Sequence, residues 1–189
     1  MRVVLLCHAA TAASRTVSFA GDEPLEAGGI AGATAMAGSL PRVDSVVRAP
    51  STRCRQTSEA LGLAELAVPV ESLAGCDFGA WTGRTLDEVL ANTPGAVTSW
   101  LTEPAANPHG GESITALLAR VGHWLDGLAG VRAVLAVVDP TVVRAAIVHA
   151  IDAHPRSVWR IDVAPLSRAV LVGDPGRWSL RALHPARPS

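Results

Sequence analysis

The sequence predicts an α/β protein, a three-layer α/β/α sandwich built on a mainly parallel sheet. Short apolar runs rich in β-branched residues alternate along the chain with longer segments of helical spacing. This alternation is typical of a parallel sheet that helices cover on both faces. The 189 residues, of which 49% are hydrophobic, suffice for one domain with a substantial core. We therefore expect a single domain over residues 1–189.

In the first half of the chain, strands and helices are expected to alternate. The apolar run 3–7 is short and β-branched, as in a strand buried on both faces. Ser51 is a candidate N-cap for a helix that runs to about residue 61. The other elements expected here are a helix over 25–40, a strand over 44–48 that ends at Ala49-Pro50, and a strand over 68–73.

The second half repeats the alternation. Residues 85–127 are mostly helical in pattern, with breaks at Pro94-Gly95 and over 104–111. The continuous apolar run 133–138 predicts a central strand. Asp139-Pro140 then opens a helix to about residue 151, since proline suits the first helical turn. The tail contains short strand candidates over 158–163, 169–172 and 178–183.

Composition excludes several classes of function. The formal net charge of −1 gives no indication of a nucleic-acid or membrane partner. The odd count of 3 cysteines, with no Cys-x-x-Cys spacing, argues against a disulfide framework and for a reducing compartment. The first apolar run is too short for a signal peptide or a membrane span. We therefore expect a cytoplasmic protein.

Five blocks in order carry a resemblance to one enzyme superfamily. They are Val3 to Thr11 around His8, Ala49-Pro50-Ser51-Thr52-Arg53-Cys54-Arg55-Gln56-Thr57, Asp77-Phe78-Gly79-Ala80-Trp81-Thr82-Gly83, Gly110-Gly111-Glu112-Ser113 and Val142-Val143-Arg144. Together they resemble the histidine phosphatase (phosphoglycerate mutase-like) superfamily over almost the whole chain. The resemblance implies the phosphoglycerate mutase-like version of the predicted sandwich.

The resemblance also implies a set of catalytic positions. Members of this superfamily attack a phosphoryl group with a histidine, which two arginines and a second histidine assist, and protonate the leaving group with a carboxylic acid. The nucleophile position is His8 and one arginine position is Arg53. The other positions depart from the pattern: Cys7 replaces an arginine, Gly75 replaces the acid, and Asp139 replaces the second histidine. Ala9 replaces a glycine, which is a milder change.

These departures weaken a phosphate site. A phosphomonoester carries nearly two negative charges, and a unit charge about 4 Å away contributes roughly 4 kcal/mol at an effective dielectric near 20. Two attractive groups are lost and Asp139 adds a repulsive one. The missing acid costs a further ~10²–10⁴-fold in rate. The sequence therefore predicts that ordinary phosphohistidine catalysis has been lost.

Three candidate catalytic residues have two interpretations each. His8 is either functional or a packed residue at the strand end. Cys7 is either a small apolar filler or a thiol activated by His8 or Arg53. Asp139 is either a helix N-cap before Pro140 or a group that orients His8. Together Cys7, His8 and Asp139 would form a new acid–base or nucleophilic set. A metal site is not expected, because neighbours in a strand point to opposite faces.

Four further residues are candidates for substrate binding, and a fifth is a candidate to replace a lost cation. Arg53 would grip an anion, and Thr11 follows the nucleophile position. His109 either reaches over the pocket or is a surface histidine. Glu112 either contacts substrate or begins a helix, where a carboxylate suits the N-terminal dipole. Arg15, in the loop after the first strand, could replace a lost cation.

Three functions stay open on the sequence. The first is a pocket adapted to other acid–base chemistry or to binding a ligand or partner. The second is a weak or unusual phosphomonoesterase that uses His8 and Arg53, and the third is a non-catalytic interaction module. A small-molecule ligand or phosphorylated metabolite, no nucleic acid, no membrane, no cofactor and no metal are expected. The resemblance makes a homodimer a further expectation, and the variable insertion over 85–108 would set specificity.

Overall fold

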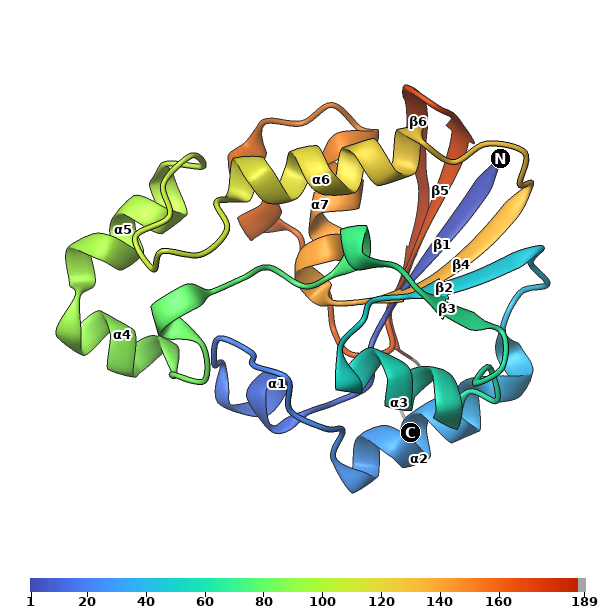
Figure 1. The fold of residues 1–189 in the computed structure, drawn as a ribbon, viewed down its shortest axis with the longest axis horizontal. Helices are drawn as coiled ribbons and strands as arrows, with labels where there is room; N and C mark the ends of the chain where they lie inside the picture. Colours follow the sequence, from blue (N-terminus) through green and yellow to red (C-terminus); the bar gives the residue numbers. More distant parts are fainter. Residues whose placement is uncertain (187–189) are drawn as a thin grey trace.

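A six-stranded sheet forms the middle layer of the computed structural model, which describes residues 1–186 (Figure 1). The strands are β1 (Arg2–Cys7), β2 (Ser45–Arg48), β3 (Ala67–Pro69), β4 (Ala133–Val138), β5 (Arg168–Asp174) and β6 (Arg177–His184). Their order is β3-β2-β4-β1-β5-β6. The first four of these are mutually parallel, whereas β5 runs antiparallel to β1 and β6 antiparallel to β5. The predicted α/β class with a mainly parallel sheet is confirmed.

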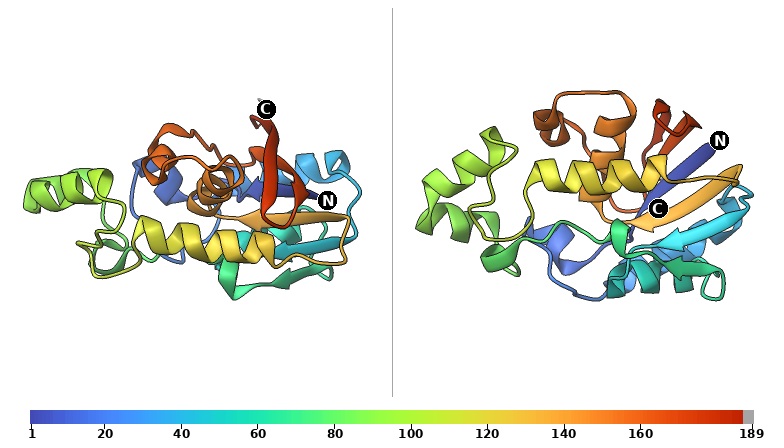
Figure 2. Two further views of the ribbon diagram at one scale, coloured as in Figure 1. Left: turned by 90° about the horizontal axis from the view of Figure 1, so that it is seen from above. Right: turned by 45° about the horizontal axis from the view of Figure 1, so that its top comes forward.

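Helices cover both faces of the sheet and extend past one end. The α-helices are α1 (Ala12–Thr16), α2 (Ala27–Met36), α3 (Thr52–Ala60), α4 (Leu86–Asn92), α5 (Pro94–Thr102), α6 (Ile114–Asp126) and α7 (Pro140–Ala150). The 3₁₀ turns are η1 (Ala37–Ser39), η2 (Glu71–Leu73), η3 (Gly79–Trp81) and η4 (Pro155–Arg160). α6 and α7 lie on one face, and α2 and α3 on the other (Figures 1 and 2). α4 and α5 project beyond the end of the sheet to which β1 and β4 point.

Two predicted strands differ in the structure. The expected strand over 68–73 is reduced to β3, after which η2 begins, and Pro69 has no N–H with which to extend the ladder. The expected strand over 158–163 is wrong, because η4 occupies Pro155–Arg160 after the His154 side chain accepts a hydrogen bond from the Arg156 N–H. The apolar side chains there pack in a helical turn instead.

Two helix boundaries also differ. The expected break at Pro94-Gly95 falls one residue earlier, because Pro94 occupies the first turn of α5, where its missing N–H leaves no bond unmade. The helix expected over 25–40 begins only at Ala27, since Leu25 pairs with Thr11 in an isolated β-bridge. That bridge fixes the loop after β1 against the start of α2.

The register of β1 on β4 determines where the polar residues after these strands meet. Leu6 pairs with Val137 and Cys7 with Val138, in parallel. The backbone N–H of His8 then donates to Val138 O at 3.0 Å. His8 and Asp139 are the next residues of two neighbouring strands, so they leave the sheet side by side at its carboxyl edge. This edge is where ligands bind in open α/β sheets.

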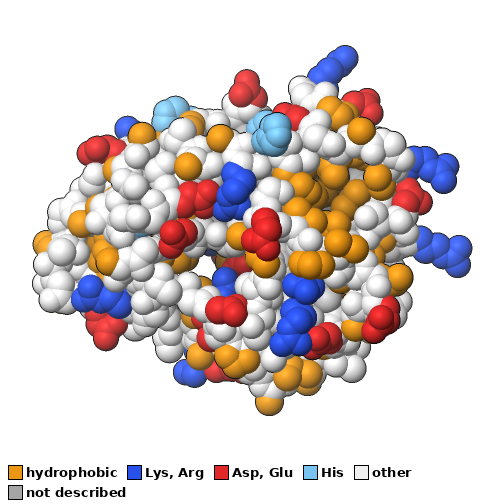
Figure 3. All heavy atoms as spheres, viewed as in Figure 1, with side chains coloured by type: hydrophobic (Ala, Val, Ile, Leu, Met, Phe, Trp, Pro, Cys, Tyr) orange, Lys and Arg blue, Asp and Glu red, His pale blue; other side chains and the backbone are white. Residues whose placement is uncertain are grey.

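One surface of the sheet is not fully covered by helices. Figure 3 shows apolar side chains gathered around the β2–β3 side of the molecule, beside α6. Val68, which pairs with Val47, is 59% exposed, and Leu66 is 61% exposed. Within residues 1–186 no helix is long and apolar enough to cross a bilayer.

Candidate functional site

His8 lies at the floor of a cleft at the carboxyl edge of the sheet. Its side chain is almost fully buried, and Nδ1 lies 2.7 Å from the carbonyl oxygen of Ala9. A carbonyl only accepts a hydrogen bond, so Nδ1 carries a proton. Nε2 faces the carboxylate of Asp139 at 3.5 Å. The ring is therefore held between a backbone acceptor and a carboxylate.

Asp139 stands between His8 and Arg53. Its Oδ1 accepts from Arg53 Nε at 2.7 Å and lies 2.5 Å from Arg53 Nη2. Asp139 occupies the N-cap position of α7, but its side chain makes no capping hydrogen bond. Burial alone would raise the pKa of this carboxyl, yet the hydrogen bond from His8 and the charges of Arg53 and His8 outweigh it and lower the pKa. The carboxylate is thus ionised and engaged with both Arg53 and His8.

Arg53 is held by more than Asp139. Its Nη1 donates to the carbonyl oxygen of Gly21, and the same atom lies 3.9 Å from Oε2 of Glu23. Burial opposes the charge of this guanidinium, but the Asp139 carboxylate outweighs burial and raises the pKa. The guanidinium, in the first turn of α3, is therefore neutralised from within the protein.

Gly75 explains how Asp139 fits. A Cβ at this position would lie 3.0 Å from Asp139 Cγ and 3.1 Å from Oδ2. The space next to residue 75 is thus already filled by the Asp139 carboxylate. Two of the sequence departures are therefore coupled in space, because a larger side chain at 75 would press on the carboxylate at 139.

The cleft above His8 has two adjoining parts. A smaller hollow of about 160 Å³ reaches Arg53 and Asp139, and a larger one of about 310 Å³ continues outward. His8, Phe78, Thr141 and Arg144 line both parts. The outer part is walled mainly by apolar and aromatic side chains, namely Phe19, Phe78, Leu86, Trp100, Trp159, Val163 and Pro165.

Arg144 is the site residue that the sequence analysis missed. It lies on α7, its Nε donates to Ile161 O at 2.9 Å, and it takes part in no ion pair among residues 1–186. Burial lowers the pKa of its guanidinium, which stays charged at neutral pH. The signal that could have found it was the Val142-Val143-Arg144 block, which places an arginine about one helical turn after Asp139.

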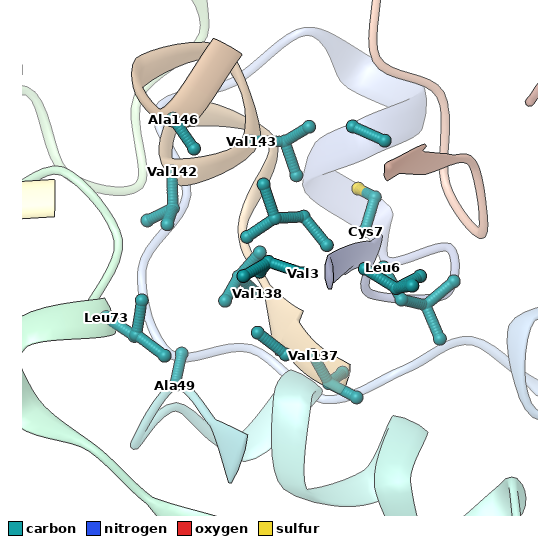
Figure 4. Close-up of a cluster of buried hydrophobic side chains, with 14 of the residues drawn as sticks. Val3, Leu6, Cys7, Ala49, Leu73, Val137, Val138, Val142, Val143 and Ala146 are labelled. Carbon is teal, nitrogen blue, oxygen red and sulfur yellow. The ribbon is translucent and has the colours of Figure 1, made fainter. Parts of the chain in front are cut away.

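Cys7 does not line the cleft. Its side chain is buried and points toward α7, on the side of Val143 (Figure 4). Burial, followed by the nearby Asp139 charge, raises the pKa of the thiol far above its ordinary value. His8, next in the chain, faces the cleft instead. The structure therefore brings His8 and Asp139 together but leaves the Cys7 thiol in the core.

The remaining candidates lie in different places. Thr11 lines the inner hollow, caps α1 through Ser14 N and donates to Glu23 Oε1 at 3.2 Å. His109 is buried against Phe78, Trp81 and Trp100 and lines neither part of the cleft. Burial lowers the pKa of its ring.

Glu112 and Arg15 are both engaged elsewhere. Glu112 forms a bidentate pair with Arg120, at 2.9 and 2.7 Å. Arg15 pairs with Glu26 and is mostly exposed, away from the cleft. Within the described part of the chain, no group of three or more His, Cys, Asp or Glu side chains could hold a metal ion.

Comparison with known proteins gives one family. The sequence profile described as the histidine phosphatase superfamily (branch 1) matches residues 3–184. The bifunctional protein Rv2228c of Mycobacterium tuberculosis is 33% identical over 196 residues, which cover 97% of this chain and 53% of that protein. This chain thus spans about half the length of the curated relatives that it matches.

Solved structures agree on the fold. The mycobacterial glucosyl-3-phosphoglycerate phosphatase, determined in complex with VO3, superposes with a TM-score of 0.85 at 25% identity, over 97% of this chain and 98% of that one. The α-ribazole phosphatase of Shigella flexneri gives 0.85 at 21% identity, over 98% of this chain and 97% of that one. The phosphoserine phosphatase of Entamoeba histolytica gives 0.86 at 16% identity, over 98% of both chains.

Proposed function

This chain belongs to branch 1 of the histidine phosphatase superfamily, and we propose that within that family it has lost ordinary phosphohistidine catalysis and uses the His8 cleft to bind an organic anion. The observation that carries the proposal is the position of Asp139. Its carboxylate lies between His8 and Arg53, at 3.5 Å from the ring and 2.7 Å from the guanidinium. Those two groups are the ones that a transferred phosphoryl group would need.

Electrostatics supports this proposal. A phosphoryl dianion placed against His8 would lie close to the Asp139 carboxylate, and each unit charge about 4 Å away contributes roughly 4 kcal/mol at an effective dielectric near 20. Glu23 adds a second carboxylate beside Arg53. Arg53 is thus balanced by two carboxylates, of which Asp139 lines the inner hollow, so Arg53 offers little net attraction to a dianion. Arg144 is the one arginine of the inner hollow that forms no ion pair within residues 1–186.

Arg144 and the outer wall indicate what the cleft binds instead. Arg144 forms no ion pair within residues 1–186 and lines both parts of the cleft. Arginine recognises carboxylates through a planar pair of N–H groups. The aromatic wall around Trp100 and Trp159 suits an apolar body. We therefore expect a small carboxylic acid with an apolar portion.

A weak phosphomonoesterase is the second candidate. The hydrogen bond of His8 Nδ1 to Ala9 O directs Nε2 toward the cleft, which is the orientation that a nucleophile needs. The superposed structures are those of phosphatases, including the glucosyl-3-phosphoglycerate phosphatase. This candidate requires Asp139 to move away from Arg53.

The first experiment measures hydrolysis of a panel of phosphomonoesters, including phosphoserine, by the wild type and by His8→Ala prepared the same way. We expect no turnover above that of the variant. Turnover that disappears in His8→Ala would overturn the proposal and make His8 a phosphate-attacking nucleophile.

A second experiment tests the ligand class by calorimetric titration with 4-phenylbutyrate. Arg144→Gln should weaken binding by about 10-fold or more, the cost of one charged hydrogen-bond partner. Arg160→Gln changes an exposed arginine on η4 outside the cleft; it is the matched control and should bind like the wild type. Equal affinities in all three proteins would reject Arg144 as the anion-binding group.

Three broader expectations belong to the same proposal. Relatives such as Rv2228c are longer proteins, and the match with this chain covers 53% of Rv2228c. We expect residues 1–189 to form a single domain that corresponds to the phosphatase-like half of such a relative. The homodimer expected from the family resemblance, and a cytoplasmic location, stay predictions.

A further inference from the structure

A second recess, separate from the His8 cleft, lies on the sheet surface formed by β1, β5 and β6. We call it the sheet groove, and it has a volume of about 500 Å³. Its lining residues are Arg2, Val4, Ser39, Pro41, Arg168, Val170, Arg181, Ala182 and His184. None of them lines the His8 cleft. The volume is within the usual range for small-ligand sites, roughly 300–1,000 Å³.

The sheet groove is cationic. Arg2, Arg168 and Arg181 line it, and no Asp or Glu among the described residues does. None of these three arginines takes part in an ion pair within residues 1–186. Three unpaired guanidinium groups around one recess repel each other, and an anion bound between them would remove that repulsion.

Two of the arginines are fixed in place but incompletely hydrogen-bonded. Arg2 Nη2 donates to Arg42 O at 2.7 Å, and Arg168 Nη1 donates to Ser39 O at 3.3 Å. Both bonds tie the side chains to the segment that follows α2. The Nε of each is buried and has no acceptor in the described chain. Because a guanidinium has five N–H donors, both groups retain donors for an oxyanion.

The third arginine is placed by an irregularity of the sheet. Val170 pairs with Ala182, but Leu171 pairs with Leu180, so Arg181 is an extra residue in β6. Such a bulge redirects one side chain without breaking the sheet. Leu180 thereby shares the face of Leu171 and packs against the core, whereas Arg181 is exposed at the groove.

The floor between the arginines is apolar. Val4, Val170 and Ala182 are consecutive partners across β1, β5 and β6, so their side chains form one row on the same face. Pro41 borders this row. A flat apolar group of a ligand could rest on the row while its anionic group reaches the arginines.

We propose that the sheet groove binds an organic phosphate, with the phosphoryl oxygens held by Arg2, Arg168 and Arg181 and the organic part resting on Val4, Val170 and Ala182. A multiply charged anion fits three unpaired arginines better than a single carboxylate does, and arginine forms paired hydrogen bonds with phosphate. This site is independent of what the His8 cleft does.

The test is calorimetric titration of the whole chain with ADP and with inorganic pyrophosphate. We expect ADP to bind the wild type, and Arg168→Gln and Arg181→Gln each to weaken it by about 10-fold or more. Pyrophosphate should bind more weakly than ADP, because it lacks a group to cover the apolar row. Arg181 is exposed, so its variant should fold like the wild type, which circular dichroism checks.

Two matched controls locate the binding. Arg177→Gln changes an exposed arginine of β6 outside the sheet groove, and Arg144→Gln changes the His8 cleft. Both should bind ADP like the wild type. The proposal is overturned if ADP does not bind at millimolar concentration, or if Arg168→Gln and Arg181→Gln bind as the wild type does. Loss of binding only in Arg144→Gln would place the phosphate in the His8 cleft and not in the sheet groove. Equal affinities for ADP and pyrophosphate would reject the proposed contact between the organic part of the ligand and the apolar row.

Discussion

Replacing Asp139 by asparagine should open the inner hollow to phosphate-like anions. The change removes one negative charge and keeps the size of the side chain. Asp139 Oδ1 lies 3.5 Å from His8 Nε2 and 2.7 Å from Arg53 Nε, so an oxyanion bound by the same two groups would lie roughly 4 Å from this carboxylate.

The size of the effect follows from that distance. One unit of repulsion at about 4 Å and an effective dielectric near 20 is worth roughly 4 kcal/mol, or about 10³-fold in affinity. Arg53 would also lose its charged partner and become available to the anion. Breaking a buried ion pair costs about 3–5 kcal/mol of stability, so the variant should have a lower midpoint of unfolding.

The assay is titration with vanadate, which resembles a phosphoryl group in charge and shape. The wild type should bind it weakly and Asp139→Asn much more tightly, at a temperature where circular dichroism shows both to be folded. Glu23→Gln is the matched control, because Glu23 lies 3.9 Å from Arg53 Nη1 and forms no ion pair with His8. The gain in vanadate affinity of Glu23→Gln should be smaller than that of Asp139→Asn.

The reasoning is refuted if Asp139→Asn binds vanadate no better than the wild type. It is equally refuted if the wild type already binds vanadate as tightly as the variant. In either case the carboxylate would not be what excludes the anion, and the proposed loss of phosphohistidine catalysis would lose its main support.

Two further predictions concern the core and the loop after β1. The thiols of Cys7, Cys54 and Cys76 should not react with a thiol reagent at pH 8 in the folded protein, because all three are buried and burial raises the pKa of each; rapid labelling of Cys7 before unfolding would instead support a reactive thiol. Gly29→Ala should lower the free energy of unfolding by more than about 1 kcal/mol, since its Cβ would lie 2.5 Å from Ala10 O, a clash that the backbone cannot easily relieve. Gly28→Ala, one residue earlier in α2, has nothing within 4 Å of its Cβ and should raise the free energy of unfolding by about 0.5–1 kcal/mol. Chemical denaturation measures both variants, and equal changes in their free energies of unfolding would contradict this account.

Much of the fold could be predicted from the sequence because the central strands are chemically distinctive. The runs that form β1 and β4 are continuous and apolar, as strands buried on both faces must be, and their predicted bounds agree with the structure to within one residue. The sequence pattern was less distinctive where one short turn took the place of an expected strand. The expected strand over 158–163 begins with Val158 and Trp159, but both lie in η4, where Pro155 in the first turn and the cap by His154 favour a 3₁₀ turn.

The sequence by itself determined the family and the order of the elements, and it identified the residues at positions 7, 75 and 139 that differ from those implied by the family resemblance. It could not determine how the replacements are arranged, because that depends on contacts between segments far apart in the chain. Only the tertiary structure places the Asp139 carboxylate between His8 and Arg53 and against Gly75. The tertiary structure also directs the Cys7 side chain into the core and brings Arg144 to the cleft. It places Arg2, Arg168 and Arg181 around one groove. Residue types can be read along the chain, whereas the charge balance of a site arises from distances that exist only after folding.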